Sequence, residues 1–88
     1  MSSYFKISYR SNKNGYFEER VPTTDAERNH LYDLSLRCKR QGAIPKTDPD
    51  AQALIQVMLN SAECPPVFKA DGINGVYIEF NTVSSVMG

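Results

Sequence analysis

The sequence predicts an α+β fold with the element order ββααββ, in which one antiparallel four-stranded sheet has two helices packed on one face. Two observations support this fold. Residues 4–10 and 76–83 alternate between apolar and polar side chains, which is typical of half-buried strands. Two stretches between residues 24 and 64 instead repeat apolar side chains at helical spacing. We expect residues 1–88 to form a single small domain in which residues 84–88 fray.

An N-terminal hairpin is predicted from two alternating segments, residues 4–10 and 16–21. Their apolar side chains match on one face: Phe5, Ile7, Tyr9, Phe17 and Val21. Between the segments, Asn14 and Gly15 supply the positive φ that a tight turn needs. Glu19 falls on the apolar face, so we expect an edge strand or a β-bulge at this position.

The two helices are predicted from their end signals as well as their spacing. The first begins at a capping box, residues 24–27, and ends before Gly42, which suits a left-handed cap. The second begins at Asp48, which is followed by a proline, and Pro65 and Pro66 end it. The buried stripe of the second helix is predicted to comprise Ala51, Leu54, Ile55, Met58, Leu59 and Ala62.

The C-terminal part of the chain is predicted to form a second hairpin. Residues 67–70 are expected to be a short strand, residues 71–75 a glycine-bearing turn, and residues 76–83 the last strand. Residues 44–47 are expected to be a connector between the helices. Because the first and last strands are the most apolar, we expect them to pair at the centre of the sheet.

Composition favours a small soluble protein without enzymatic activity. Ten Lys and Arg balance ten Asp and Glu, and no apolar run reaches the length of a membrane span. Only Cys38 and Cys64 carry thiols, which indicates a reducing, cytoplasmic location rather than a disulfide-stabilised secreted domain. No spacing of nucleophile, base or ligand predicts a catalytic centre, a metal site or a cofactor; His30 and Cys38 are expected to pack as ordinary helix residues.

The outward face of the predicted sheet is the first candidate site. Alternation places three tyrosines and two arginines on it: Tyr4, Arg10, Tyr16, Arg20 and Tyr77. Rigid amphipathic rings beside mixed charge are typical of protein-binding surfaces, so we predict an adaptor-like or inhibitor-like binding module. The same rings are also suited to stacking on single-stranded bases, or simply to cross-strand pairing.

A basic cluster at the end of the first helix is the second candidate site. It comprises Arg37, Lys39, Arg40 and Lys46. The alternative function is therefore a nucleic-acid-associated regulator that contacts phosphates through these cations. The same charges also complement the negative end of the helix dipole, which requires no ligand.

Charge is divided unevenly along the chain. Residues 1–46 carry nine basic and five acidic side chains, whereas residues 47–88 carry one basic and five acidic. A dipolar domain is suited to docking a charged partner or a second copy, so a structural subunit of a homo-oligomer is a further alternative. If both halves contribute to one sheet, the charges intermix in space instead and the asymmetry disappears.

Overall fold

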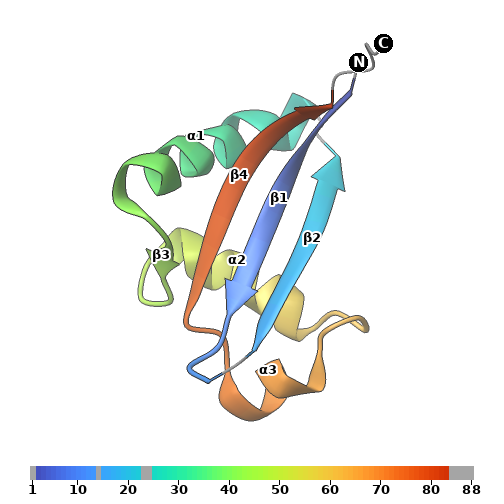
Figure 1. Cartoon of the computed structure of the whole chain (residues 1–88), viewed down its shortest axis with the longest axis vertical. Helices are drawn as coiled ribbons and strands as arrows, with labels where there is room; N and C mark the ends of the chain where they lie inside the picture. The colour runs from blue at the N-terminus through green and yellow to red at the C-terminus, as the bar shows by residue number, and fades with distance from the viewer. Residues whose placement is uncertain (1, 14, 23–24, 84–88) are drawn as a thin grey trace.

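The structure, a computed structural model, describes residues 2–13, 15–22 and 25–83. The predicted capping box, which needs Thr24, and the predicted fraying of residues 84–88 lie outside this part of the chain. Figure 1 shows a long twisted sheet with helices behind it. The elements are β1 (Ser2–Arg10), β2 (Tyr16–Pro22), α1 (Asp25–Gln41), β3 (Ile44–Pro45), α2 (Pro49–Leu59), α3 (Pro66–Asp71) and β4 (Gly75–Val83).

The sheet has four strands in the order β2-β1-β4-β3, and every neighbouring pair is antiparallel. The predicted α+β class and the antiparallel four-stranded sheet are therefore confirmed, as is the central pairing of the first and last strands. Ile7 faces Glu19 of β2 on one side and Ile78 of β4 on the other. The element order is ββαβααβ rather than the predicted ββααββ.

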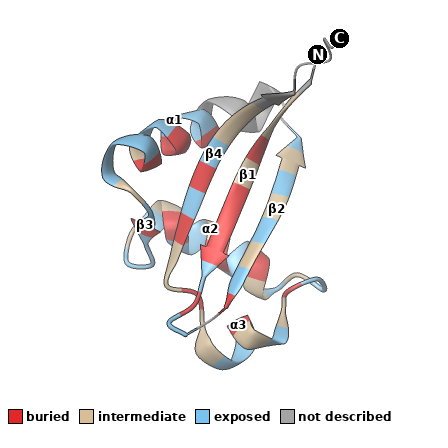
Figure 2. Cartoon of the chain, in the orientation of Figure 1, coloured by how far each residue is buried: buried red, intermediate tan, exposed pale blue. Residues whose placement is uncertain are grey.

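The core lies between one face of the sheet, called here the inner face, and the helices. β1 contributes every second residue to this core, and Figure 2 shows buried residues along β1 and on α1 and α2. The sheet residues of the core are Phe5, Ile7, Tyr9, Ile44, Val76 and Ile78, and α1 and α2 add Leu31, Leu34, Cys38, Ala51, Ile55 and Met58. The inner-face alternation predicted for both long strands is correct.

The predicted strand at residues 67–70 is wrong, because these residues belong to the short helix α3. Pro66 occupies the first helical turn, where its fixed φ suits a helix and its missing N–H costs nothing. Phe68 is fully buried, and its carbonyl oxygen accepts a 2.8 Å hydrogen bond from the N–H of Gly72. One anchoring side chain in six residues leaves no periodicity from which to distinguish a helix from a strand.

The predicted connector between the helices contains the two-residue strand β3, which pairs with the start of β4. Gly75 permits this contact, since a Cβ there would lie 3.1 Å from the carbonyl oxygen of Ile44. The N–H of Lys46 donates to the carbonyl oxygen of Asn74 at 2.8 Å and continues the pairing. β4 therefore begins between two strands, and the predicted second hairpin does not exist.

Two of the helix-end predictions are confirmed. The predicted end of the second helix at Pro65 and Pro66 is wrong, because α2 ends at Leu59 with Asn60 as its C-cap. Asp48 caps α2 by accepting a 2.9 Å hydrogen bond from the N–H of Asp50. Gly42 has φ of +89° after α1, and its N–H donates to the carbonyl oxygen of Cys38 at 2.7 Å. The α2 stripe is shorter than predicted, because the helix ends at Leu59 and Ala62 is exposed. Among the described residues, no helix has the length and apolar character needed to cross a membrane.

The first hairpin differs from the prediction at its turn. Gly15 does not have positive φ; Asn14 lies outside the described residues. Glycine is required because a Cβ at this position would lie 2.4 Å from the Ser11 hydroxyl oxygen. The N–H of Gly15 donates to that hydroxyl at 2.9 Å. For Glu19 the sequence allowed either an edge strand or a bulge. The continuous register between β1 and β2 excludes a bulge, and β2 lies at the edge of the sheet.

Candidate functional site

The outer face of the sheet, opposite the core, carries all five residues of the predicted protein-binding surface. Strand register arranges this face in rows across β2, β1 and β4. The rows are Tyr16–Arg10–Gly75, Glu18–Ser8–Tyr77, Arg20–Lys6–Glu79 and Pro22–Tyr4–Asn81. Tyr16 and Tyr77 are 51% and 37% exposed and lie in neighbouring rows on opposite sides of β1.

A hollow of about 670 Å³ crosses the outer face around Ser8 and Gly75. It exists because two small residues, Ser8 and Gly75, lie in rows whose other members are large. The rings of Tyr16 and Tyr77 flank it, and Pro45 of β3 closes its far side. An extended ligand in the hollow would therefore contact the apolar surfaces of the two rings and the polar atoms of the floor.

One end of the hollow is an ion-pair cluster centred on Lys6. The Lys6 Nζ atom lies 3.2 Å from a carboxylate oxygen of Glu79 and 3.8 Å from one of Glu18. The hydrogen bond to Glu79, with the charges of both carboxylates, raises the pKa of Lys6 above its ordinary value. Lys6 is thus already neutralised within the protein, and its cluster forms a polar boundary to the hollow.

Two arginines of the outer face stack on tyrosine rings. The Arg10 guanidinium carbon lies 5.7 Å from the ring centroid of Tyr16, and that of Arg20 lies 4.9 Å from the centroid of Tyr4. The Tyr16 hydroxyl is held in turn by Glu18 and by Ser8 Oγ, the latter at 3.4 Å. Within the described part of the chain, no carboxylate forms an ion pair with Arg10, so its charge is available.

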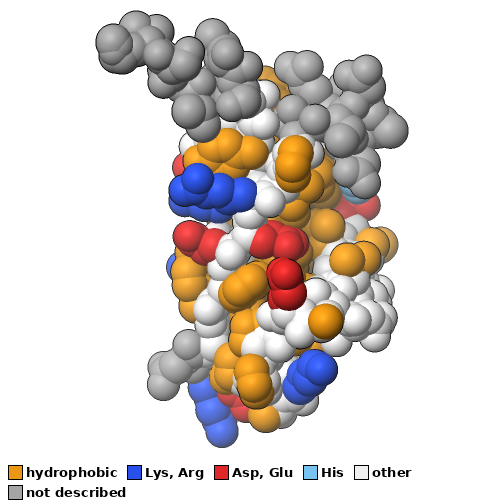
Figure 3. All heavy atoms as spheres, turned by 90° about the vertical axis from the view of Figure 1, so that its right-hand side faces the viewer, with side chains coloured by type: hydrophobic (Ala, Val, Ile, Leu, Met, Phe, Trp, Pro, Cys, Tyr) orange, Lys and Arg blue, Asp and Glu red, His pale blue; other side chains and the backbone are white. Residues whose placement is uncertain are grey.

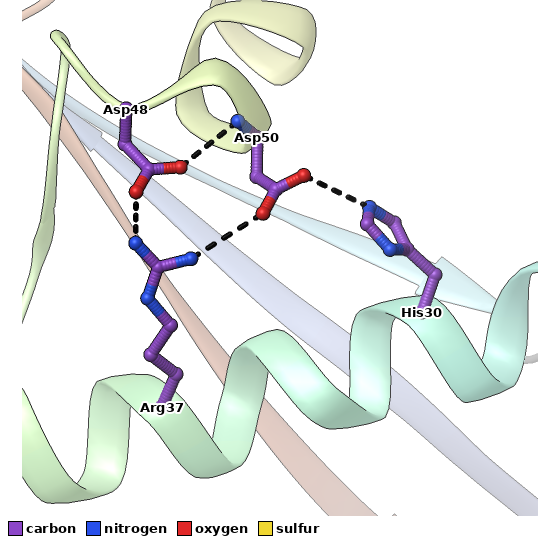
Figure 4. A network of polar contacts seen from close by, with 4 residues as sticks. All are labelled: His30, Arg37, Asp48 and Asp50. Carbon is purple, nitrogen blue, oxygen red and sulfur yellow. Dashed lines mark hydrogen bonds and ion pairs between the residues drawn. The ribbon is translucent and has the colours of Figure 1, made fainter.

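The predicted basic cluster is not one surface of free cations. Figure 4 shows the Arg37 guanidinium bound by two carboxylates, those of Asp48 and Asp50, the second at 3.3 Å. His30 approaches the same Asp50 carboxylate at 3.8 Å. The hydrogen bond from Arg37 is the main cause that lowers the pKa of Asp48. Arg37 therefore joins α1 to the start of α2.

The other three members of the basic cluster are exposed. Lys39 and Arg40 lie in the last turn of α1, where they complement the helix dipole, and Lys46 follows β3. Because Arg37 is engaged by Asp48 and Asp50, three cations of the cluster remain for the predicted phosphate contacts. Their role in nucleic-acid binding stays a prediction.

The uneven charge of the two halves of the sequence intermixes in the fold, as expected where both halves contribute to one sheet. Basic residues of the first half pair with acidic residues of the second half: Lys6 with Glu79, Lys13 with Asp71, and Arg37 with Asp48 and Asp50. The sheet pairs the N-terminal strand β1 with the C-terminal strand β4, and Arg37 joins α1 to the start of α2. The domain consequently has intermixed charge rather than a positive and a negative half.

The two cysteines are free, buried thiols. Burial raises the pKa of Cys38, which disfavours a reactive thiolate, and its sulfur accepts a 3.4 Å hydrogen bond from the N–H of Ile78. Among the described residues, no three His, Cys, Asp or Glu side chains converge in a way that would hold a metal ion. Both thiols are packed into the core of the described part of the protein.

Comparisons of the chain with known protein families, with curated proteins and with solved structures found no match. The candidate site therefore rests on its own geometry. Sequence reasoning missed Ser8, Gly75 and Pro45, which shape the hollow. The only sequence indication was the small Ser8 among large outward residues; the contribution of Gly75 and Pro45 depends on β3, whose pairing was not predicted.

Proposed function

We propose that this protein is a non-enzymatic binding module that holds an extended segment of another protein in the outer-face hollow. The observation that carries the proposal is the pair Tyr16 and Tyr77, which flank a concave floor with their rings partly exposed. Rigid aromatic side chains around a depression supply contact area at low entropic cost. With only two cysteines, both free, we expect the protein to act in the cytoplasm.

The chemistry of the hollow specifies the segment that fits it. Arg10 offers a cation without an ion-pair partner among the described residues, so the ligand carries a carboxylate at that end. An apolar side chain of the ligand covers the ring surfaces of Tyr16 and Tyr77. At the other end Lys6 is neutralised by Glu18 and Glu79, which leaves no unpaired charge for a second ionic contact.

A displayed library of random peptides tests this specificity directly. Selection on the wild-type protein should enrich peptides with Asp or Glu near an apolar residue. The Ser8→Ile variant places a larger side chain on the floor of the hollow and should not retain those peptides. Arg40→Glu, a charge reversal on α1 outside the hollow, should retain them. Equal enrichment by Ser8→Ile and wild type would contradict the proposed site.

Nucleic acid is the alternative ligand, either at the tyrosines or at the exposed cations of the basic cluster. Fluorescence anisotropy with single-stranded and double-stranded oligonucleotides at low and physiological salt separates the two functions. Our proposal predicts no binding at physiological salt. Tight, salt-sensitive binding that Lys39→Gln with Arg40→Gln abolishes would replace our proposal with the nucleic-acid function.

A further inference from the structure

The outer side of edge strand β2 presents backbone groups that no described strand pairs. The N–H of Ser11 donates to the carbonyl oxygen of Gly15 at 3.0 Å, while the carbonyl oxygen of Arg10 accepts from Asn74 on the β4 side. Hydrogen bonds between β1 and β2 therefore alternate so that odd-numbered residues of β2 bond to β1. The N–H and C=O groups of Tyr16, Glu18 and Arg20 consequently point outward from the sheet.

We propose that this edge pairs with the same edge of a second copy of the chain, antiparallel and with Glu19 on the two-fold axis. The pairing makes one continuous sheet from two protomers, and each Glu18 faces the partner's Arg20. This register joins residues whose backbone groups both point outward, and it keeps the inner faces on one side. Pro22 ends the ladder because it has no N–H to donate.

Charge complementarity selects this register over its neighbours. If the two-fold axis passes through Glu18 instead, Glu18 lies opposite the partner's Glu18. If the axis passes through Arg20, Arg20 lies opposite the partner's Arg20. Each of these three registers brings one like-charge pair together on the axis, but only the register centred on Glu19 adds two Glu–Arg pairs, which stabilise paired strands. Glu18 and Arg20 are thus complementary to a second copy of the strand only when Glu19 lies on the axis.

The inner face of β2 supports the same pairing. Phe17 and Val21 are only partly buried against the core, and the proposed register brings each Phe17 beside the partner's Val21. Figure 3, which views this side of the molecule, shows hydrophobic patches next to acidic side chains and a basic group. The two Glu19 carboxylates face each other on the axis, each with a Tyr9 hydroxyl as donor, and their repulsion limits the affinity.

Light scattering on the isolated chain, from micromolar to about 1 mM, tests the proposal independently of any ligand in the hollow. Wild-type protein should show a monomer–dimer equilibrium. Glu18→Arg alone and Arg20→Glu alone should each raise the dimer Kd at least about tenfold, because every cross-strand Glu–Arg pair becomes a like-charge pair. Lys39→Glu, a reversal on α1, should leave the Kd unchanged. Circular dichroism checks that each variant is folded.

Mixing the two single variants gives the decisive result. At positions 18 and 20, the Glu18→Arg chain carries two cations and the Arg20→Glu chain carries two carboxylates. Each cation then faces a carboxylate across the interface, so the mixture should form a heterodimer at concentrations at which each variant alone is monomeric. The double variant Glu18→Arg with Arg20→Glu should recover the homodimer. A monomeric wild type at every concentration would overturn the proposal. So would folded single variants that dimerise like wild type, or a mixture that stays monomeric.

Discussion

The Tyr9 hydroxyl donates a 2.9 Å hydrogen bond to the Glu19 carboxylate, which joins a buried ring of central strand β1 to edge strand β2. Burial, followed by the nearby Glu19 charge, raises the pKa of Tyr9, so the phenol stays protonated and remains a donor. The contact explains how an acidic residue occupies the inner face between Phe17 and Val21. An inward charge on an edge strand also disfavours unspecific edge pairing.

Tyr9→Phe should destabilise the protein by about 1–3 kcal/mol, because the partly buried Glu19 carboxylate loses a donor. Glu19→Gln should cost less, since the amide oxygen still accepts from the Tyr9 hydroxyl. Urea denaturation of both single variants and the double variant measures the coupling free energy between the two side chains. Tyr9→Phe with wild-type stability would show that the hydrogen bond contributes nothing to folding.

Arg37→Gln should lower the free energy of unfolding, because Asp48 and Asp50 are left as neighbouring carboxylates without their shared cation. The loss should be measurable as a fall in Tm, because small losses of stability shift the Tm of a domain of this size by several degrees. Lys39→Gln is the matched control, and its exposed position should keep the change within about 0.5 kcal/mol. Equal effects of the two substitutions would contradict a structural role for Arg37.

Acidification should weaken the same network through Asp48. Its pKa is lowered in the folded protein below the ordinary value of 3.8, so its contribution to stability is complete above that pH. The contribution is lost as pH falls from about 3.8 through the folded pKa, when the unfolded chain takes up the proton first. Thermal melts between pH 7 and pH 2 should show a smaller acid-induced loss for Asp48→Asn, which keeps the helix cap. Parallel curves would contradict this assignment.

The long strands were predictable because each obeys a simple period. Phe5, Ile7 and Tyr9 repeat at the spacing of two that one buried face requires, as do Val76 and Ile78. Glu19 broke that period and correctly indicated an edge strand. The same alternation predicts that the tyrosines and arginines share the outer face, whereas their mutual contacts depend on the strand register.

The parts that were not predictable depend on contacts between distant segments. Helix α3 has one buried anchor, Phe68, which carries no period. β3 is two residues long, and its pairing with β4 makes Pro45 a wall of the hollow. The engagement of Arg37 by Asp48 and Asp50 requires α1 and α2 to approach each other, which no local pattern of charge reveals. Long-range pairing therefore determined both the shape of the hollow and the composition of the basic cluster.

The most direct measurement compares peptide affinity and Tm for the double variant Arg10→Glu with Tyr16→Ala, using a peptide enriched by the wild-type protein. The proposed function predicts that the Kd rises at least about tenfold while Tm changes by no more than about 4 °C, because both side chains are exposed. An unchanged Kd would contradict the hollow as the binding site. A fall in Tm above about 10 °C would show that the two residues stabilise the sheet instead.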